Sequence, residues 1–227
     1  MGISLHYIKK GSGTPLLLLH GNGESGDYFV HQMDEFAQSF TVYAVDTRGH
    51  GRSPRGTAPF TISQFADDVL GFMDEHGIEN AHILGFSDGG NIALTLALRH
   101  PERVGRLVLN GANLDPAGVK SSVQIPIVLG YKLASLFKAP KARANAELLG
   151  LMVNEPHIDP KELERLTMPV LVIVGSRDMI KASHSRLIAD SLPKGRLAVI
   201  EGDHFIANKQ SARFNRVVLG FLKEEIP

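Results

Sequence analysis

Residues 81–100, AHILGFSDGGNIALTLALRH, decide the fold of this chain. The stretch begins with a short apolar run, Ala81–Gly85, and ends with a longer amphipathic one, Gly89–His100. Between them stands Gly85-Phe86-Ser87-Asp88-Gly89, which matches the pattern G-x-S-x-G. That pattern is weak by itself, but a strand before it and a helix after it are the setting in which it carries a nucleophilic serine. The stretch therefore predicts a strand, a sharp turn and a helix, with Ser87 at the turn.

The glycines of this motif have a physical role in such a turn. A serine on so tight a turn takes a strained backbone conformation, and neighbours without a Cβ avoid clashes. The turn would lift the Ser87 hydroxyl above the sheet edge. It would also point the unpaired N–H groups of the helix N-terminus at the reacting centre. The alternative is a glycine-rich turn with an exposed serine and no chemistry.

Short apolar runs alternate with amphipathic stretches along the rest of the chain. Several runs are almost continuous in Leu, Val and Ile, which is typical of parallel strands covered on both faces. This alternation predicts an α/β fold with a mostly parallel sheet and helices on both faces. The expected strands are Ile3–Ile8, Pro15–His20, Thr41–Asp46, Ala81–Gly85, Arg106–Asn110, Val170–Val174 and Arg196–Glu201, and the expected helices are Asp27–Gln38, Ile62–His76, Gly89–His100, Ala182–Ser191 and Ser211–Lys223.

One segment, residues 114–167, breaks this alternation because it contains no clear strand. Val123–Phe137 and Ala142–Val153 have helical character, and Pro140 separates them. We expect a single α/β domain over residues 1–227 with this segment as a small helical lid over one edge of the sheet. Its aliphatic residues suggest an apolar acyl or alcohol pocket. A long helical crossover without a role at the site is the alternative.

Composition narrows the possible partners. The 227 residues include 24 Lys and Arg and 24 Asp and Glu, so the formal net charge is zero, and a nucleic-acid partner is not expected. The chain has no cysteine, which excludes disulfides and a cysteine nucleophile and fits the cytoplasm. The N-terminus has no signal-peptide pattern, and no apolar run is long enough for membrane insertion. The oligomeric state is left open.

Five landmarks in their order resemble the α/β-hydrolase superfamily, and the resemblance covers nearly the whole chain. They follow successive strands and include the serine motif itself. They are His20-Gly21, Asp46-Thr47-Arg48-Gly49-His50-Gly51-Arg52-Ser53, Gly85–Gly89, Gly175-Ser176-Arg177-Asp178 and Gly202-Asp203-His204-Phe205. The resemblance implies an α/β-hydrolase sheet with a nucleophile elbow. It also implies the chain order serine, acid, histidine for the catalytic residues.

In this resemblance Ser87 is the nucleophile and His204 the general base, because serine reacts only when a base takes its proton. Asp178 follows the strand Val170–Val174, where the family carries the acid that orients the histidine. Asp203 is the alternative acid, but side chains of adjacent residues rarely face one another. His20 is expected to shape a loop without taking part in the chemistry.

A tetrahedral intermediate needs two N–H donors for its oxyanion. We expect these oxyanion-hole donors to be the backbone N–H groups of Asn22 and Asp88. The run Ser-Asp-Gly-Gly from Ser87 resembles the biphenyl-hydrolase-like proteins, which cleave amino-acid esters. In that resemblance the side chain of Asp88 is substrate-binding and holds an α-ammonium group. The alternative is that Asp88 faces solvent or pairs with a neighbouring cation.

A second motif competes with this interpretation. Gly21-Asn22-Gly23-Glu24-Ser25-Gly26 is a G-x-G-x-x-G sequence, and Asp46 follows Gly26 at the spacing of a dinucleotide-binding fingerprint. An NAD-dependent oxidoreductase is therefore an alternative, although it leaves the serine motif and the late Asp and His unexplained. A small-molecule receptor with little turnover is another alternative, since the same fold can serve binding alone.

The sequence thus predicts a serine esterase that acts on a small carboxylic ester, with an α-amino-acid ester as one candidate, and with no cofactor and no metal. The residues assigned to it are Ser87, His204 and Asp178, with Asn22 and Asp88 at the oxyanion. Thioesters, peroxyacid formation and C–C bond hydrolysis stay open, because the same residues support each reaction.

Overall fold

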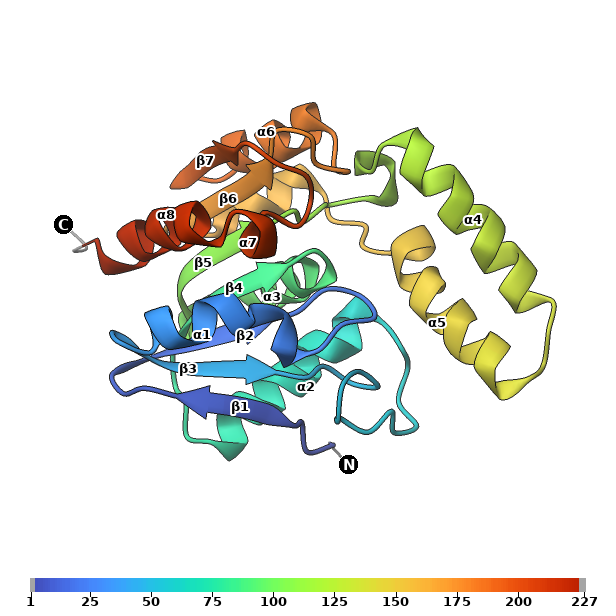
Figure 1. Cartoon of the computed structure of the whole chain (residues 1–227), viewed down its shortest axis with the longest axis horizontal. Helices are drawn as coiled ribbons and strands as arrows, with labels where there is room; N and C mark the ends of the chain where they lie inside the picture. Colours follow the sequence, from blue (N-terminus) through green and yellow to red (C-terminus); the bar gives the residue numbers. More distant parts are fainter. Residues whose placement is uncertain (1–2, 225–227) are drawn as a thin grey trace.

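A seven-stranded sheet forms the centre of the protein, with the strand order β1-β3-β2-β4-β5-β6-β7 (Figure 1). We describe residues 3–224 of a computed structural model. Only β1 runs antiparallel to its neighbour, and the other five pairings are parallel. The strands are β1 (Tyr7–Lys10), β2 (Thr14–Leu19), β3 (Phe40–Val45), β4 (Ala81–Phe86), β5 (Val104–Asn110), β6 (Val170–Gly175) and β7 (Gly195–Ile200).

Helices cover both faces of this sheet, and each face has its own apolar core. On one face lie α1 (Val30–Phe36), α7 (Ile206–Lys209) and α8 (Ser211–Lys223). On the other lie α2 (Ile62–Glu75), α3 (Asp88–Arg99) and α6 (Ala182–Asp190). Leu16 to Leu19 of β2 are fully buried and alternate between the two cores, because successive side chains of a strand point to opposite faces. The predicted α/β fold class is confirmed.

Two local predictions differ from the structure. The first strand begins at Tyr7 and not at Ile3, because only Tyr7–Lys10 pairs antiparallel with β3. The helix expected over Asp27–Gln38 is divided into a 3₁₀ turn at Gly26–Phe29 and α1. The Gly26 N–H donates to Asp46 Oδ1 at 2.7 Å, which ties the start of this segment to the end of β3.

The segment between β5 and β6 contains a helical hairpin of α4 (Ser121–Ser135) and α5 (Pro140–Asn154). Figure 1 shows this hairpin beyond the carboxyl ends of the parallel strands. Helix α4 packs mainly against α5. No helix in residues 3–224 is long and apolar enough to cross a membrane.

Three contacts tie α5 to the rest of the domain. Arg55 pairs with Glu147 through two hydrogen bonds of 2.5 and 2.9 Å. The Asn22 side chain donates to the Leu148 carbonyl at 2.7 Å, and the Ile62 N–H donates to the carboxylate of Glu155 at 2.7 Å. Helix α5 is therefore held close to the loop that follows β2.

Candidate active site

Ser87 lies on a sharp turn between β4 and α3. Its backbone has φ 52° and ψ −121°, and within residues 3–224 it is the one residue other than glycine with a positive φ. A side chain in this region of backbone space is strained, so the surrounding packing must hold it there. A Cβ on Gly85 would collide with the backbone of Gly89, and one on Gly89 would collide with that of Leu19. Only glycine fits at these two positions, each two residues from the serine.

His204 and Asp178 meet at the ends of two neighbouring strands. The imidazole Nδ1 lies 2.7 Å from Asp178 Oδ1, and both side chains are buried. Asp178 also accepts hydrogen bonds from the backbone N–H groups of Ile180 (2.9 Å) and Gly175 (3.3 Å). Burial would raise the pKa of Asp178, but these donors and the nearby imidazole hold it below its usual range. The carboxylate is thus ionised at neutral pH and fixes the proton of His204 on Nδ1.

The other imidazole nitrogen, Nε2 of His204, is buried and has no hydrogen-bond partner among the described residues. Ser87 and His204 both lie close to Asn110 and Gly111, at the end of β5. The Ser87 N–H donates to the Asn110 carbonyl at 2.8 Å, and a Cβ on Gly111 would approach His204 Cε1 to 2.6 Å. The Phe86 ring lies 4.8 Å from the imidazole, centroid to centroid. Hydrogen bonds between a nucleophile and its base often tighten only when substrate binds.

Asp203, the alternative acid, has other partners. Its carboxylate pairs with Lys209 and accepts the Phe205 N–H at 3.0 Å. The Asp203 side chain is 42% exposed, whereas that of Asp178 is 3% exposed. The structure therefore brings Asp178, and not Asp203, to the imidazole.

His20 holds the loop that carries Asn22. Its Nδ1 lies 2.7 Å from the Gly21 carbonyl and its Nε2 accepts the Thr47 N–H at 3.0 Å, so Nδ1 carries the proton and donates. Burial lowers the pKa of His20 to about 4, which keeps the ring neutral in this arrangement. Because a peptide unit is planar and trans, a fixed Gly21 carbonyl also fixes the direction of the Asn22 N–H. The sequence indicates a loop-shaping role for His20. In the structure its two hydrogen bonds join the loop after β2 to Thr47, which follows β3.

Asp88 is the first residue of α3, where a helix leaves its N–H groups without intrahelical partners. Its side chain is buried and does not face solvent. Asp88 Oδ1 accepts a long hydrogen bond of 3.3 Å from Asn91, and Oδ2 has no partner among the described residues. Burial raises the pKa of Asp88 to about 6; the nearby Asn22 side chain opposes this shift and the nearby Glu155 adds to it.

Two further carboxyl groups near the turn have raised pKa values. Glu24 receives the Gly21 N–H at 3.2 Å, and burial raises its pKa to about 7. Burial also raises the pKa of Glu155, which closes α5. The sequence gives no signal for Glu155, because it belongs to the helical segment and no motif includes it. This side of the site is therefore acidic and partly desolvated.

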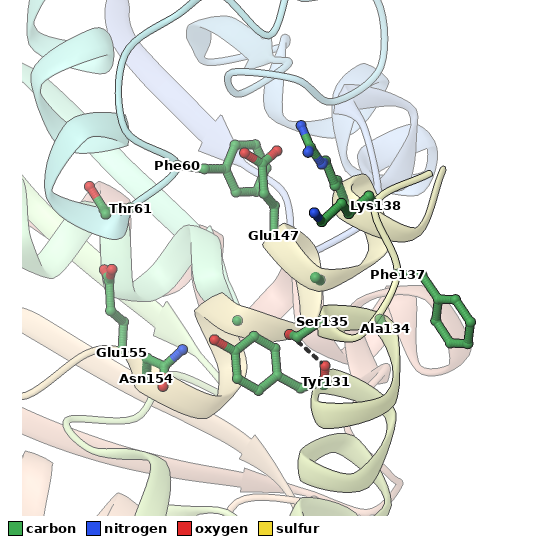
Figure 2. Close-up of a pocket in the computed structure, with 13 residues that line it drawn as sticks. Phe60, Thr61, Tyr131, Ala134, Ser135, Phe137, Lys138, Glu147, Asn154 and Glu155 are labelled. Carbon is green, nitrogen blue, oxygen red and sulfur yellow. Dashed lines mark hydrogen bonds between the residues drawn. The ribbon is translucent and has the colours of Figure 1, made fainter. Parts of the chain in front are cut away.

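A pocket of about 650 Å³ lies between the hairpin and the loop before α2 (Figure 2). Its wall includes the aromatic rings of Phe60 and Tyr131 and the polar side chains of Thr61, Asn154 and Glu155. In Figure 2 the Tyr131 hydroxyl points towards Asn154 and Glu155, whereas Phe137 points away from the cavity. Glu155 lies at this pocket, and its negative charge contributes to the raised pKa of Asp88.

The glycine-rich sequence from Gly21 to Gly26 forms the loop between β2 and the 3₁₀ turn. Asp46 does not face open space, as a ribose-binding acid would. Its carboxylate accepts the N–H groups of Gly26 (2.7 Å) and Arg52 (2.8 Å) and contacts His6 Nδ1 at 2.9 Å. These contacts show that Asp46 stabilises the loop that ends at Gly26. Within residues 3–224, no group of three or more His, Asp or Glu side chains is arranged to hold a metal ion.

Comparisons with known proteins agree with this fold. A family model described as the alpha/beta hydrolase fold matches residues 14–150. A protein of Caulobacter sp. (strain K31) whose name proposes carbamate hydrolase activity (RutD) is 32% identical, over 92% of this chain and 91% of its own length. The 2-hydroxymuconate semialdehyde hydrolase of Pseudomonas sp. (strain CF600) is 31% identical over 98% and 92%.

Solved structures show the same fold. Est816, described as an N-acyl homoserine lactone degrading enzyme, superposes with a TM-score of 0.81 and 26% identity, covering 96% of this chain and 97% of its own. The enol-lactonase from Burkholderia xenovorans LB400 superposes with a TM-score of 0.83 at 24% identity, covering 98% and 97%.

Proposed function

This chain belongs to the alpha/beta-hydrolase fold family and is a hydrolase, and we propose that it cleaves small carboxylic esters through a covalent intermediate on Ser87. The observation that carries the proposal is the buried pair of His204 and Asp178, whose imidazole lies 4.8 Å, centroid to centroid, from the ring of Phe86, the residue before Ser87. A serine, a neutral imidazole with a free nitrogen and an ionised orienting acid are what acyl transfer requires.

In the proposed cycle, His204 Nε2 takes the Ser87 proton while Oγ attacks the ester carbonyl. The carbonyl electron pair moves onto oxygen, and the backbone N–H groups of Asn22 and Asp88 donate to that oxyanion. As the intermediate collapses, the bond to the alcohol breaks and His204 returns the proton to the departing oxygen. Water then attacks the acyl-enzyme, gives its proton to His204, and the acid leaves as Ser87 is reprotonated.

We further propose that the α4–α5 segment, within residues 114–167, acts as a lid over this site. The Asn22 side chain bonds to the Leu148 carbonyl, so α5 contacts the residue whose backbone is proposed to hold the oxyanion. The pocket of Figure 2 would then receive the part of the substrate that extends from the reacting carbon.

The carboxylates of Asp88 and Glu155 support a cationic substrate, such as an α-amino-acid ester. A buried anion next to the nucleophile hinders charge development at the oxyanion unless a cation compensates it. Asp88 Oδ2 is buried and has no hydrogen-bond partner within residues 3–224, which suits an acceptor for a substrate ammonium group. The amino-acid ester is thus the favoured substrate class within the esterase proposal.

A reactive phosphonate tests the nucleophile directly. We expect an alkyl fluorophosphonate to add one adduct, which peptide mass spectrometry places on Ser87, and we expect Ser87→Ala to remain unlabelled while keeping its circular dichroism spectrum. Labelling that persists in folded Ser87→Ala would place the nucleophile elsewhere.

Turnover on a matched panel tests the substrate class. The panel contains p-nitrophenyl acetate, a p-nitrophenyl α-amino-acid ester and a p-nitrophenyl carbamate. We expect the amino-acid ester to win in kcat/KM by tenfold or more, about 1.4 kcal/mol of transition-state binding, and Asp88→Asn to remove that preference. Preference for the carbamate would favour the chemistry named for the Caulobacter relative. Labelling of Ser87 without multiple turnovers would favour a receptor.

A further inference from the structure

One side of α4, continued into the turn of the hairpin, carries an exposed apolar stripe, defined as Ile125, Leu129, Leu133, Leu136 and Phe137. These side chains are 57–76% exposed, and they make up five of the nine large exposed apolar residues in the part of the chain that the structure describes. The first four follow the spacing four, four, three, so they lie along one side of the helix. Such a row costs free energy in water unless something covers it.

Packing within the hairpin does not use this stripe fully. Helix α4 meets α5 through other positions: Gly130 faces Leu149, the Tyr131 ring packs on Gly150, and the Gln124 side chain donates to the Met152 carbonyl at 3.1 Å. Leu133 and Phe137 border an apolar groove of about 530 Å³ that runs between the two helices. The stripe therefore continues into a recess and offers a broad apolar contact.

The charge of this segment is one-sided. Residues 116–146 contain no Asp or Glu but five cations, while the whole chain is balanced. The rest of the chain therefore carries a formal charge of −5. The cations are Lys120, Lys132, Lys138, Lys141 and Arg143, and the last four belong to α4, to the turn of the hairpin or to the first turn of α5.

We propose that this hairpin docks onto an anionic lipid surface, with the stripe in the headgroup region and the cations beside it. An apolar row flanked by Lys and Arg is the pattern of helices that lie in a membrane interface. Lysine stems can cover apolar surface while their ammonium groups reach the phosphates. Two facing hairpins would bring five cations against five, so charge repulsion opposes a symmetric contact between the hairpins of two copies.

The proposal is independent of the hydrolase chemistry, so its test needs no turnover. The full-length protein is sedimented with vesicles of phosphatidylcholine alone, or of equal parts phosphatidylcholine and phosphatidylglycerol, at low salt. We expect at least tenfold stronger binding to the mixed vesicles, falling as salt screens the attraction. Ser87→Ala should bind like the wild type, which separates this result from the failure of the esterase proposal.

Matched variants assign the binding to the hairpin. Leu129→Ser with Leu133→Ser should weaken binding at least tenfold, whereas the control pair Leu187→Ser with Val199→Ser, exposed elsewhere, should not. Because all four residues are exposed, thermal unfolding should show that the variants fold.

The cations are tested in the same way. Lys132→Gln with Lys138→Gln should weaken binding by about fivefold per cation, and Lys161→Gln with Lys194→Gln should leave it unchanged.

Three results would overturn the proposal. The first is equal or absent binding to both vesicles, and the second is unchanged binding by the stripe variant. The third is binding to soluble poly-glutamate that competes fully with the vesicles and survives the stripe substitutions, which would assign the surface to an acidic protein.

Discussion

Replacing Asp178 by asparagine tests the most specific feature of the site, the direction of the proton on His204. Asp178 Oδ1 accepts from the imidazole at 2.7 Å, while Oδ2 accepts the Gly175 N–H at 3.3 Å. An asparagine amide must place its NH₂ group on one of these two sides. Facing the imidazole, it would drive the proton to Nε2 and remove the base. Facing Gly175, it would oppose the Gly175 N–H and leave only a neutral amide oxygen, without the charge of the carboxylate, to stabilise the imidazolium.

Either orientation should lower kcat with little change in fold. Replacing the acid of a serine triad by asparagine costs about 10⁴ in kcat, which is about 5 kcal/mol at 1.36 kcal/mol per tenfold. The assay is steady-state hydrolysis of the best ester of the panel, with the unfolding midpoint in urea measured alongside. Asp203→Asn is the matched control, because Asp203 pairs with Lys209 and should leave kcat within about twofold.

The reasoning would be refuted by an Asp178→Asn enzyme that retains a tenth or more of the wild-type kcat. A large loss in Asp203→Asn with little loss in Asp178→Asn would exchange the two assignments.

Three further outcomes follow from particular contacts. The pKa of Asp88 is raised to about 6, so its carboxyl group is neutral below that pH and ionised above it. A substrate α-ammonium group loses its proton near pH 8. In pH–rate profiles, the preference for amino-acid esters should therefore peak between about pH 6 and pH 8. Gly111→Ala adds a Cβ 2.6 Å from His204 Cε1 at a φ of +64°, and should lower kcat about a hundredfold by displacing the imidazole. Arg48→Met leaves buried Asp68 without the two hydrogen bonds of 2.6 Å that it now accepts, and should cost about 3–5 kcal/mol in urea unfolding, much of it recovered when Asp68→Leu is added.

Vesicle binding by the hairpin would place the proposed active site near a lipid surface. The stripe lies on the same segment that contacts Asn22 through Leu148. A docked protein would therefore hold its α5 contact with the loop after β2 close to the lipid surface. The sequence alone favours a different use of these aliphatic residues, as an acyl or alcohol pocket, but five of them are exposed in the structure.

The sequence by itself determined the features that depend on neighbours in the chain. The α/β class follows from alternating apolar and amphipathic runs, and the turn at Ser87 follows from glycines two residues away on each side. Helix Ser211–Lys223 was predicted at its observed bounds, and Ala182–Ser191 within one residue, because each is an amphipathic helix whose period is visible locally. The order of landmarks also led to Asp178 and His204 before any contact was known.

Tertiary structure alone decided what depends on residues far apart in the chain. The start of β1 was set by its pairing with β3, since an exposed edge strand has little pattern of its own. The pKa of Asp88, raised to about 6, depends on its burial and on the charge of Glu155, which follows α5 and is distant in the sequence. Whether an apolar residue of the hairpin is covered or exposed depends on where α4 meets α5, because a helical period fixes which residues share a face but not which face finds a partner.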